Sequence, residues 1–220
     1  MFRAPGFELN FVNPVTVVVG DNGSGKSTLL ESIATLAGFG KLGGSRDHQV
    51  FTQNPWDEPD GATLARVLGA SWLPKVSRGW FFRAESFFSL AQFLEKSAHD
   101  SQEQGPGFLE HSHGEGFMRF FNERGGGQGL YVLDEPESAL SPLRQFELIK
   151  LIHNRVGAGR AQVIMATHSP ILMAFPGATV LGIDRGGMSE VDYRTTQAYR
   201  LYREFFLDPS GTIDTMINEQ

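Results

Sequence analysis

Eight consecutive residues near the amino terminus, GDNGSGKS at 20–27, have the types and the spacing that bind phosphate groups. In the pattern G-x-x-x-x-G-K-S, a glycine-rich backbone curls until its N–H groups point inward at phosphate oxygens. Lys26 would reach the β- and γ-phosphates of a nucleoside triphosphate, and the Ser27 hydroxyl would reach a Mg²⁺ ion. The other residues expected to bind the phosphates are Asn22, Gly23, Ser24, Gly25 and Thr28.

The flanking residues predict the elements that must position this loop. Residues 15–19 are apolar and mostly β-branched, which indicates a buried strand of a parallel sheet. Residues 28–36 carry leucine and isoleucine at helical spacing, so a helix is expected to follow the loop. Its amino terminus would add partial positive charge at the phosphates. A glycine-rich turn with a surface lysine is the alternative, and the agreement of strand, spacing and helix disfavours it.

A second candidate site follows another apolar run. Residues 130–133 (LYVL) predict a buried strand, and Asp134 and Glu135 come directly after it. Ligands bind at the carboxyl ends of parallel strands, so both carboxylates are expected beside the phosphate loop. Asp134 would hold Mg²⁺ through water, and Glu135 would polarise the attacking water. A solvated acidic turn is the alternative, which the presence of the phosphate loop makes less favoured.

The rest of the chain continues the alternation of strands and helices. Further strands are expected at 80–82, 162–166 and 179–184, a short edge strand at 7–11, and helices at 62–68, 89–96, 117–122 and 142–155. This alternation predicts an α/β fold with a mainly parallel central sheet flanked by helices. With 220 residues the chain forms one domain over 1–220, including a small helical lobe at about 86–128.

Composition excludes several classes of protein. The chain is 40% hydrophobic and 20% charged, as globular domains are, and its net charge of −6 does not favour a coat for nucleic acid. It has no cysteine, so neither a disulfide framework nor a cysteine zinc site is expected. No apolar run approaches the roughly 20 residues of a membrane span, and the amino terminus lacks a signal-peptide pattern. A cytoplasmic protein without an integral membrane segment is the expectation.

The residues around the second site resemble those of a known superfamily. The run DEPESALS at 134–141 resembles the Walker B motif and D-loop of ATP-binding-cassette (ABC) ATPases. His168, in the sequence MATHSP after the strand at 162–166, is similar to the switch histidine that contacts the γ-phosphate in that superfamily. The alternative for His168 is a turn histidine packed near a strand end.

A degenerate signature loop completes this pattern. The sequence HSHGE at 111–115 lies where ABC ATPases carry L-S-G-G-Q, with Ser112 22 residues before Asp134. The Ser112 hydroxyl and the Gly114 backbone would cup a γ-phosphate at the start of a helix beginning near Phe117. Metal binding by His99, His111 and His113 is the alternative, although these histidines lack a standard zinc spacing.

Taken together, the motifs resemble a family of small bacterial ATPases of ABC and SMC-like type, from about residue 8 to the carboxyl terminus. The resemblance implies an ABC-type head of the P-loop NTPase fold that hydrolyses ATP with Mg²⁺. It also implies catalytic roles for Lys26, Glu135 and His168. Adenine recognition is weakly represented, because the nearby aromatic or basic candidates are few: Arg3, Phe7 and Phe11.

The segment that should carry a Q-loop glutamine departs from the family. Glu85, at a predicted strand end, is the candidate to face Mg²⁺ or the attacking water, and Gln53 is the runner-up. Arg83 could instead meet phosphate. A plain ion pair between Glu85 and Arg83 is the alternative for both side chains.

The resemblance further implies a homodimer in which two copies sandwich two ATP molecules. The phosphate loop of one copy would face Ser112 and Gly114 of the other, and only tighter ATP binding by the closed state can drive closure. The client would be a protein or DNA, in repair or phage defence. Alternatives are the nucleotide-binding subunit of an ABC transporter, disfavoured by Glu137 where transporters usually carry threonine, and a binding module without turnover, disfavoured by Glu135.

Overall fold

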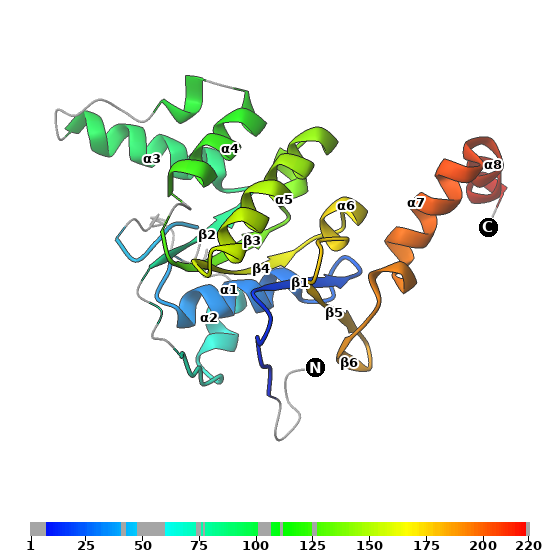
Figure 1. Ribbon diagram of the computed structural model, residues 1–220, viewed down its shortest axis with the longest axis horizontal. Coiled ribbons are helices and arrows are strands. Elements are labelled where there is room, and N and C mark those ends of the chain that lie inside the picture. Colours follow the sequence, from blue (N-terminus) through cyan, green and yellow to red (C-terminus); the bar gives the residue numbers. More distant parts are fainter. Residues whose placement is uncertain are drawn as a thin grey trace.

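A six-stranded sheet in the order β2-β3-β4-β1-β5-β6 forms the centre of the computed structural model, which describes residues 8–40, 43–47, 60–73, 76, 78–100, 107–110, 112–124 and 127–218 (Figure 1). The strands are β1 (Val15–Gly20), β2 (Gly79–Arg83), β3 (Gly129–Asp134), β4 (Ala161–Ala166), β5 (Thr179–Asp184) and β6 (Gly187–Glu190). The first five run parallel, and β6 pairs antiparallel with β5. The predicted mainly parallel sheet is therefore confirmed.

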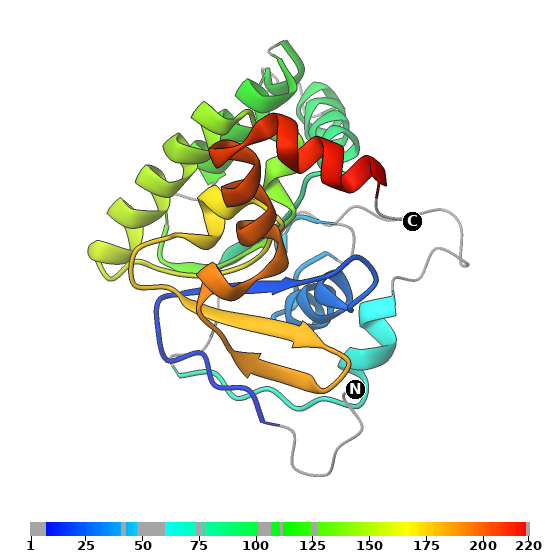
Figure 2. The ribbon, with the colours of Figure 1, turned by 90° about the vertical axis from the view of Figure 1, so that its right-hand side faces the viewer.

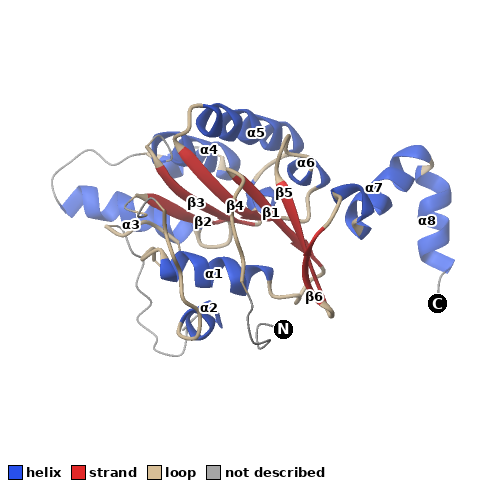
Figure 3. Cartoon of the chain, turned by 60° about the horizontal axis from the view of Figure 1, so that its bottom comes forward, coloured by secondary structure: helices blue, strands red, loops and turns tan. Residues whose placement is uncertain are grey.

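Helices cover both faces of this sheet, as the fold class predicted (Figure 3). They are α1 (Lys26–Leu36), α2 (Asp60–Ala65), α3 (Phe87–Asp100), α4 (His113–Arg124), α5 (Pro142–Gly157), α6 (Pro170–Met173), α7 (Gln197–Leu207) and α8 (Pro209–Asn218), with the 3-10 turns η1 (Phe108–Glu110), η2 (Pro136–Ala139) and η3 (Tyr193–Thr195). Helices α1 and α2 lie on one face, and α3, α4, α5 and α6 lie on the other. None of the helices in the described part combines the length and apolarity needed to cross a bilayer.

Alternation along the buried strands produces the two cores. Val17 and Val19 belong to the core under α5, whereas Val18 belongs to the core under α1. In β2, Phe82 joins the first core and Phe81 the second. Because successive side chains of a strand point to opposite faces, a strand that is apolar throughout must be covered on both sides.

Aromatic packing attaches the helical lobe of α3, η1 and α4 to the sheet. The ring of Phe82 lies 5.2 Å from that of Phe120 and 5.0 Å from that of Phe121, both with edge-to-face geometry. Phe87 and Phe108 extend the cluster through further edge-to-face pairs. Such pairs contribute about 0.5–1.5 kcal/mol each beyond area burial, so this lobe is held firmly to β2.

The two carboxyl-terminal helices extend from the body rather than covering the sheet (Figures 1 and 3), and in Figure 2 they lie toward the viewer. Neither α7 nor α8 contains a buried residue. Several large apolar side chains are exposed there, with Phe206 72% and Leu207 76% exposed.

Two sequence predictions differ from the structure. Within the predicted edge strand 7–11, the described residues 8–11 form no strand and pair with neither edge strand of the sheet, β2 or β6. The Phe11 carbonyl instead accepts a hydrogen bond from the Gln162 side chain at 2.9 Å. The helix expected to begin near Phe117 begins at His113. Helices α6, α7 and α8 and strand β6 were not predicted.

Candidate functional site

The parallel register brings the candidate residues to one edge of the sheet. Arg83 at the end of β2 pairs in register with Asp134 of β3, and Asp134 pairs with Ala166 of β4. Ala166 is in turn in register with Val18, two residues before the phosphate loop. Segments far apart in the chain therefore end side by side, as expected for ligand sites of parallel sheets.

The loop between β1 and α1 has the backbone of a phosphate cradle. Gly23 and Gly25 have φ of 75° and 97°, in the left-handed region that glycine adopts without steric cost. A turn hydrogen bond of 3.1 Å joins the Ser24 N–H to the Asp21 carbonyl. The hydroxyl oxygen of Ser24 is buried and has no hydrogen-bond partner, which fits a loop whose polar groups would pair with a bound ligand.

Lys26 begins α1 and lies folded along this loop. Its ammonium donates hydrogen bonds to the carbonyls of Gly20 at 2.9 Å and Asp21 at 3.1 Å, and the residue is only 4% exposed. Burial lowers the pKa of Lys26 below its usual value, while the carboxylates of Glu135 and Asp134 act in the opposite direction. A buried ammonium held by carbonyls alone is well placed to meet a phosphate.

Ser27 and Asp134 meet across the sheet edge. The Ser27 hydroxyl donates a hydrogen bond of 3.1 Å to Asp134 Oδ1, although the two residues are 107 positions apart. Hydroxyl and carboxylate oxygens are ligands that Mg²⁺ prefers, so the donor set fits this ion. Asp134 is 3% exposed, and its burial raises the pKa of the carboxyl from 3.8 to about 6.

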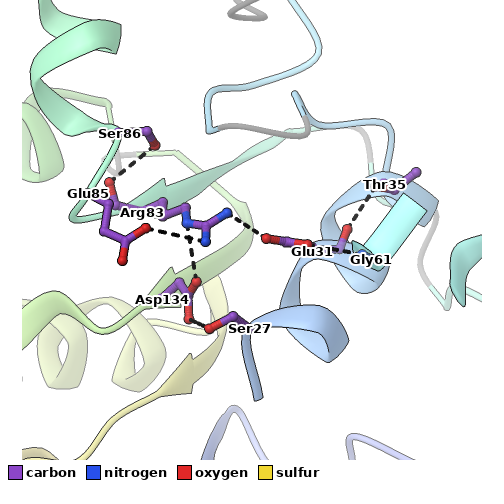
Figure 4. A network of polar contacts seen from close by, with 8 residues as sticks. All are labelled: Ser27, Glu31, Thr35, Gly61, Arg83, Glu85, Ser86 and Asp134. Atoms are coloured by element: carbon purple, nitrogen blue, oxygen red, sulfur yellow. Dashed lines mark hydrogen bonds and ion pairs between the residues drawn. The ribbon is translucent and has the colours of Figure 1, made fainter. Parts of the chain in front are cut away.

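Arg83 neutralises the carboxylates around this pair (Figure 4). Its guanidinium lies 2.5 Å from Glu31, 3.4 Å from Glu85 and 3.6 Å from Asp134. The Glu31 carboxylate also accepts the N–H of Gly61 at 3.0 Å. Glu85 thus makes the ion pair that the sequence left open as an alternative, and its side chain is 74% exposed. Its role as a Mg²⁺ ligand stays a prediction.

The raised pKa of Asp134 leads to a prediction about stability without nucleotide. A carboxyl with a pKa higher in the folded state than in the unfolded state favours folding below about pH 4 and loses that contribution as pH rises through about 6. A shift from 3.8 to about 6 is worth on the order of 3 kcal/mol. The free energy of unfolding of wild type should therefore fall, relative to that of Asp134→Asn, when the pH is raised from 5 to 8. Urea unfolding of both proteins in EDTA at the two pH values measures this difference. An equal difference between the two proteins at both pH values would contradict this.

Glu135 and His168 face each other beyond the end of β3. His168 Nε2 lies 3.8 Å from Glu135 Oε1, and this ring nitrogen is buried with no hydrogen-bond partner. Glu135 has φ of 47° and is the only non-glycine residue in the described ranges with positive φ. A left-handed glutamate costs free energy, and such strain is concentrated at functional sites. The two predicted catalytic side chains are thus brought together with Lys26 at one edge.

Ser112 and Gly114 lie in the helical lobe, away from the phosphate loop of the same chain. The Ser112 N–H and hydroxyl both donate to Glu115 Oε2, at 3.3 and 2.9 Å, so these contacts stabilise the start of α4 at His113 rather than near Phe117. A Cβ on Gly114 would approach the Ala139 carbonyl to 2.8 Å, so a side chain there would push α4 from η2.

Several sequence candidates lie outside the described residues: Arg3, Phe7, Gln53 and His111. In the ranges that are described, no group of three or more His, Cys, Asp or Glu side chains could hold a metal ion. Sequence reasoning missed Glu31, whose signal was an acidic residue one helical turn after Ser27, on a helix that packs on the sheet. It also missed the hydrogen bonds of Glu137 with His168 and of Gln145 with Ser169, because they join residues that are 31 and 24 positions apart in the chain.

Two protein-family models match separate parts of the chain. One, described as "AAA domain", matches residues 2–63, which include the phosphate loop. The other, described as "AAA domain, putative AbiEii toxin, Type IV TA system", matches residues 117–174, which include Asp134, Glu135 and His168. No curated protein matches.

Solved structures of low similarity include parts of ABC transporters and SMC head domains. The cbiO1 protein from Clostridium perfringens, part of the ABC transporter complex cbiONQ, is 17% identical, with 92% of this chain and 87% of that chain covered and a TM-score of 0.46. The SMC head domain from Thermotoga maritima is 15% identical, with 80% and 89% covered and a TM-score of 0.41.

Proposed function

We propose that the chain is a small ATPase domain of ABC and SMC-like type that hydrolyses ATP with Mg²⁺ as an ATP-sandwiched homodimer acting on a client protein or DNA. The two AAA-domain models that match residues 2–63 and 117–174 support nucleotide hydrolysis. The observation that carries the proposal is the 3.1 Å hydrogen bond between Ser27 and Asp134. It joins the phosphate loop to the acidic strand end. The two alternatives from the sequence, a surface glycine turn and a solvated acidic turn, do not account for such a contact.

In the proposed reaction, groups of this chain would position the substrate and transfer the proton. The loop N–H groups and the amino terminus of α1 would hold the phosphates, and Lys26 would exchange its carbonyl partners for phosphate oxygens. Ser27 and Asp134 would hold Mg²⁺, which neutralises charge developing on the phosphates. Glu135 would orient the attacking water and accept its proton, and His168 would contact the γ-phosphate.

Buried polar atoms without partners support a ligand at this place. In the described part of the chain four side-chain atoms are of this kind, and three surround the site: Ser24 Oγ, Glu137 Oε2 and His168 Nε2. Unpaired buried groups cost about 1–3 kcal/mol each, and a bound triphosphate would pair with the Ser24 hydroxyl and the His168 imidazole. The Glu137 oxygen, as an acceptor, would not pair with a phosphate.

The dimer is proposed because Ser112 and Gly114 are at the amino terminus of α4. No hydrogen bond or ion pair within the described part of one chain joins Ser112 to the phosphate loop. A second copy could bring this terminus to the γ-phosphate, where its partial positive charge would be favourable. The Glu115 carboxylate, now bonded to Ser112, would then have to turn away.

ATP turnover measured with and without Mg²⁺ tests the proposal. We expect release of phosphate that depends on Mg²⁺ and that falls per subunit when the protein is diluted below its dimer dissociation constant. Sedimentation with ATP should show a dimer that ADP does not support. Absence of turnover at any concentration would refute the ATPase, whereas constant turnover per subunit over a wide dilution range would refute the obligatory dimer alone.

A further inference from the structure

Glu137, which the proposed reaction does not use, is bonded to the histidine loop. It lies in η2, after β3, whereas His168 follows β4, and the two are 31 positions apart. Glu137 Oε1 accepts a hydrogen bond of 2.5 Å from the backbone N–H of His168. A carboxylate acceptor makes this a charge-assisted bond, which is stronger than the usual amide–carbonyl bond.

A second connection joins the same two segments. Gln145 of α5 is 7% exposed; its amide donates to the Leu140 carbonyl at 3.0 Å, and its oxygen accepts the Ser169 hydroxyl at 2.5 Å. The segment after Glu135 and the loop around His168 are therefore linked twice, at the His168 backbone and at the Ser169 side chain. In the described part of the chain, the Glu137 side chain bonds to the His168 backbone, whereas the Gln145 side chain bonds to Ser169.

The position of the imidazole depends on this backbone contact. His168 Nε2 makes no hydrogen bond of its own, and its ring lies beside Glu135 at 3.8 Å. Since no side-chain hydrogen bond to Nε2 orients the ring, the main chain has to place it. Glu137 also keeps one buried carboxylate oxygen unpaired, which is an unfavourable arrangement unless the contact serves the site.

We propose that Glu137 is a positioning residue for the ATPase reaction, holding the His168 backbone so that the imidazole stays beside Glu135. This inference rests on the proposed function. Without the acceptor, the buried N–H of His168 would seek another partner and the loop would shift. Misplacement of a catalytic group by about 1 Å can cost as much as 10²-fold in rate.

Steady-state kinetics of two variants test the hydrogen bond. Glu137→Ala should lower kcat by about 10- to 100-fold with KM changed less than about threefold, because the ATP-binding groups are untouched. Glu137→Gln keeps an acceptor oxygen and should stay within about threefold of wild type. Glu147→Ala, which removes an exposed carboxylate paired with Arg144 on α5, is the matched control and should behave as wild type. Equal losses in Glu137→Gln and Glu137→Ala would overturn the proposal.

A double-mutant cycle asks whether Glu137 acts through His168. In a His168→Ala background, Glu137→Ala should cause little further loss of kcat, because the side chain that it positions is gone. A merely structural role would lower the rate by the same factor in both backgrounds. Multiplicative losses would therefore overturn the inference even if each single variant is slow.

A measurement that does not depend on turnover distinguishes loss of the hydrogen bond from misfolding of the variant. In ¹H–¹⁵N spectra, the His168 amide should be shifted downfield and exchange slowly in wild type and Glu137→Gln, and lose both properties in Glu137→Ala. An unchanged His168 amide in a folded Glu137→Ala protein would refute the bond. Wild type without ATP turnover would refute the proposed function and this inference together, whereas an active wild type with an equally active Glu137→Ala would refute the inference alone.

Discussion

Glu135→Gln should slow ATP turnover by about 10²- to 10⁴-fold, the usual contribution of a positioned general base. Glutamine preserves the shape of the side chain but cannot accept the proton of the attacking water. The variant should also accumulate as an ATP-dependent dimer in sedimentation, because the ligand that joins the two copies is no longer consumed. Phosphate release and sedimentation of the same preparation, with Mg²⁺ and ATP, measure both effects.

Two results would contradict this expectation in different ways. Turnover equal to that of wild type would remove Glu135 from the chemistry. Lost turnover without a shift to the dimer would leave Glu135 as the base but would contradict the sandwich. Glu147→Gln is the control for loss of a carboxylate, since Glu147 lies on the exposed side of α5 and pairs with Arg144.

Lys26→Ala should weaken ATP binding by roughly 10- to 100-fold and abolish measurable turnover. A hydrogen bond to a charged group contributes about 1.5–3 kcal/mol, and Lys26 is the cation buried within the loop itself. Removing a buried ammonium also removes its desolvation cost, so the melting temperature without nucleotide should not fall sharply. Calorimetric titration of ATP together with thermal unfolding gives both quantities.

The control for this variant is Lys150→Ala, which removes an exposed ammonium from α5. It should bind and hydrolyse ATP as wild type does. Unaltered ATP affinity in Lys26→Ala would refute the loop as the phosphate site. A large loss of stability in the same variant would show that the two carbonyl contacts of Lys26, at 2.9 and 3.1 Å, support the fold.

Local sequence determined the phosphate loop and the fold class. A β-branched run, a glycine-rich loop of fixed spacing and an apolar helical face specify β1, the loop and α1 through contacts between near neighbours. The apolar run ahead of Asp134 likewise predicts β3, because a strand covered on both faces must be apolar throughout. The local pattern failed at residues 8–11, which alternate as a strand does but pair with neither edge strand of the sheet.

Only the tertiary structure decided which of these residues meet. Strand order puts β4 between β3 and β1. The pairing of β3 with β4 brings His168 to Glu135, and the pairing of β4 with β1 places Ser27 within reach of Asp134. The pKa of Asp134 depends on its burial and on the Arg83 guanidinium, neither of which spacing reveals.

The contact of Glu137 with His168 is likewise decided by the tertiary structure. In the sequence it is one acidic residue among several in a turn, and in the fold its carboxylate accepts the backbone N–H of His168. Sequence determines chemistry that is contained in one short segment, because the chain itself then sets the spacing. Chemistry shared between strands 30 or 100 residues apart depends on the register of the sheet, since hydrogen-bonded strands alone bring those side chains to one edge.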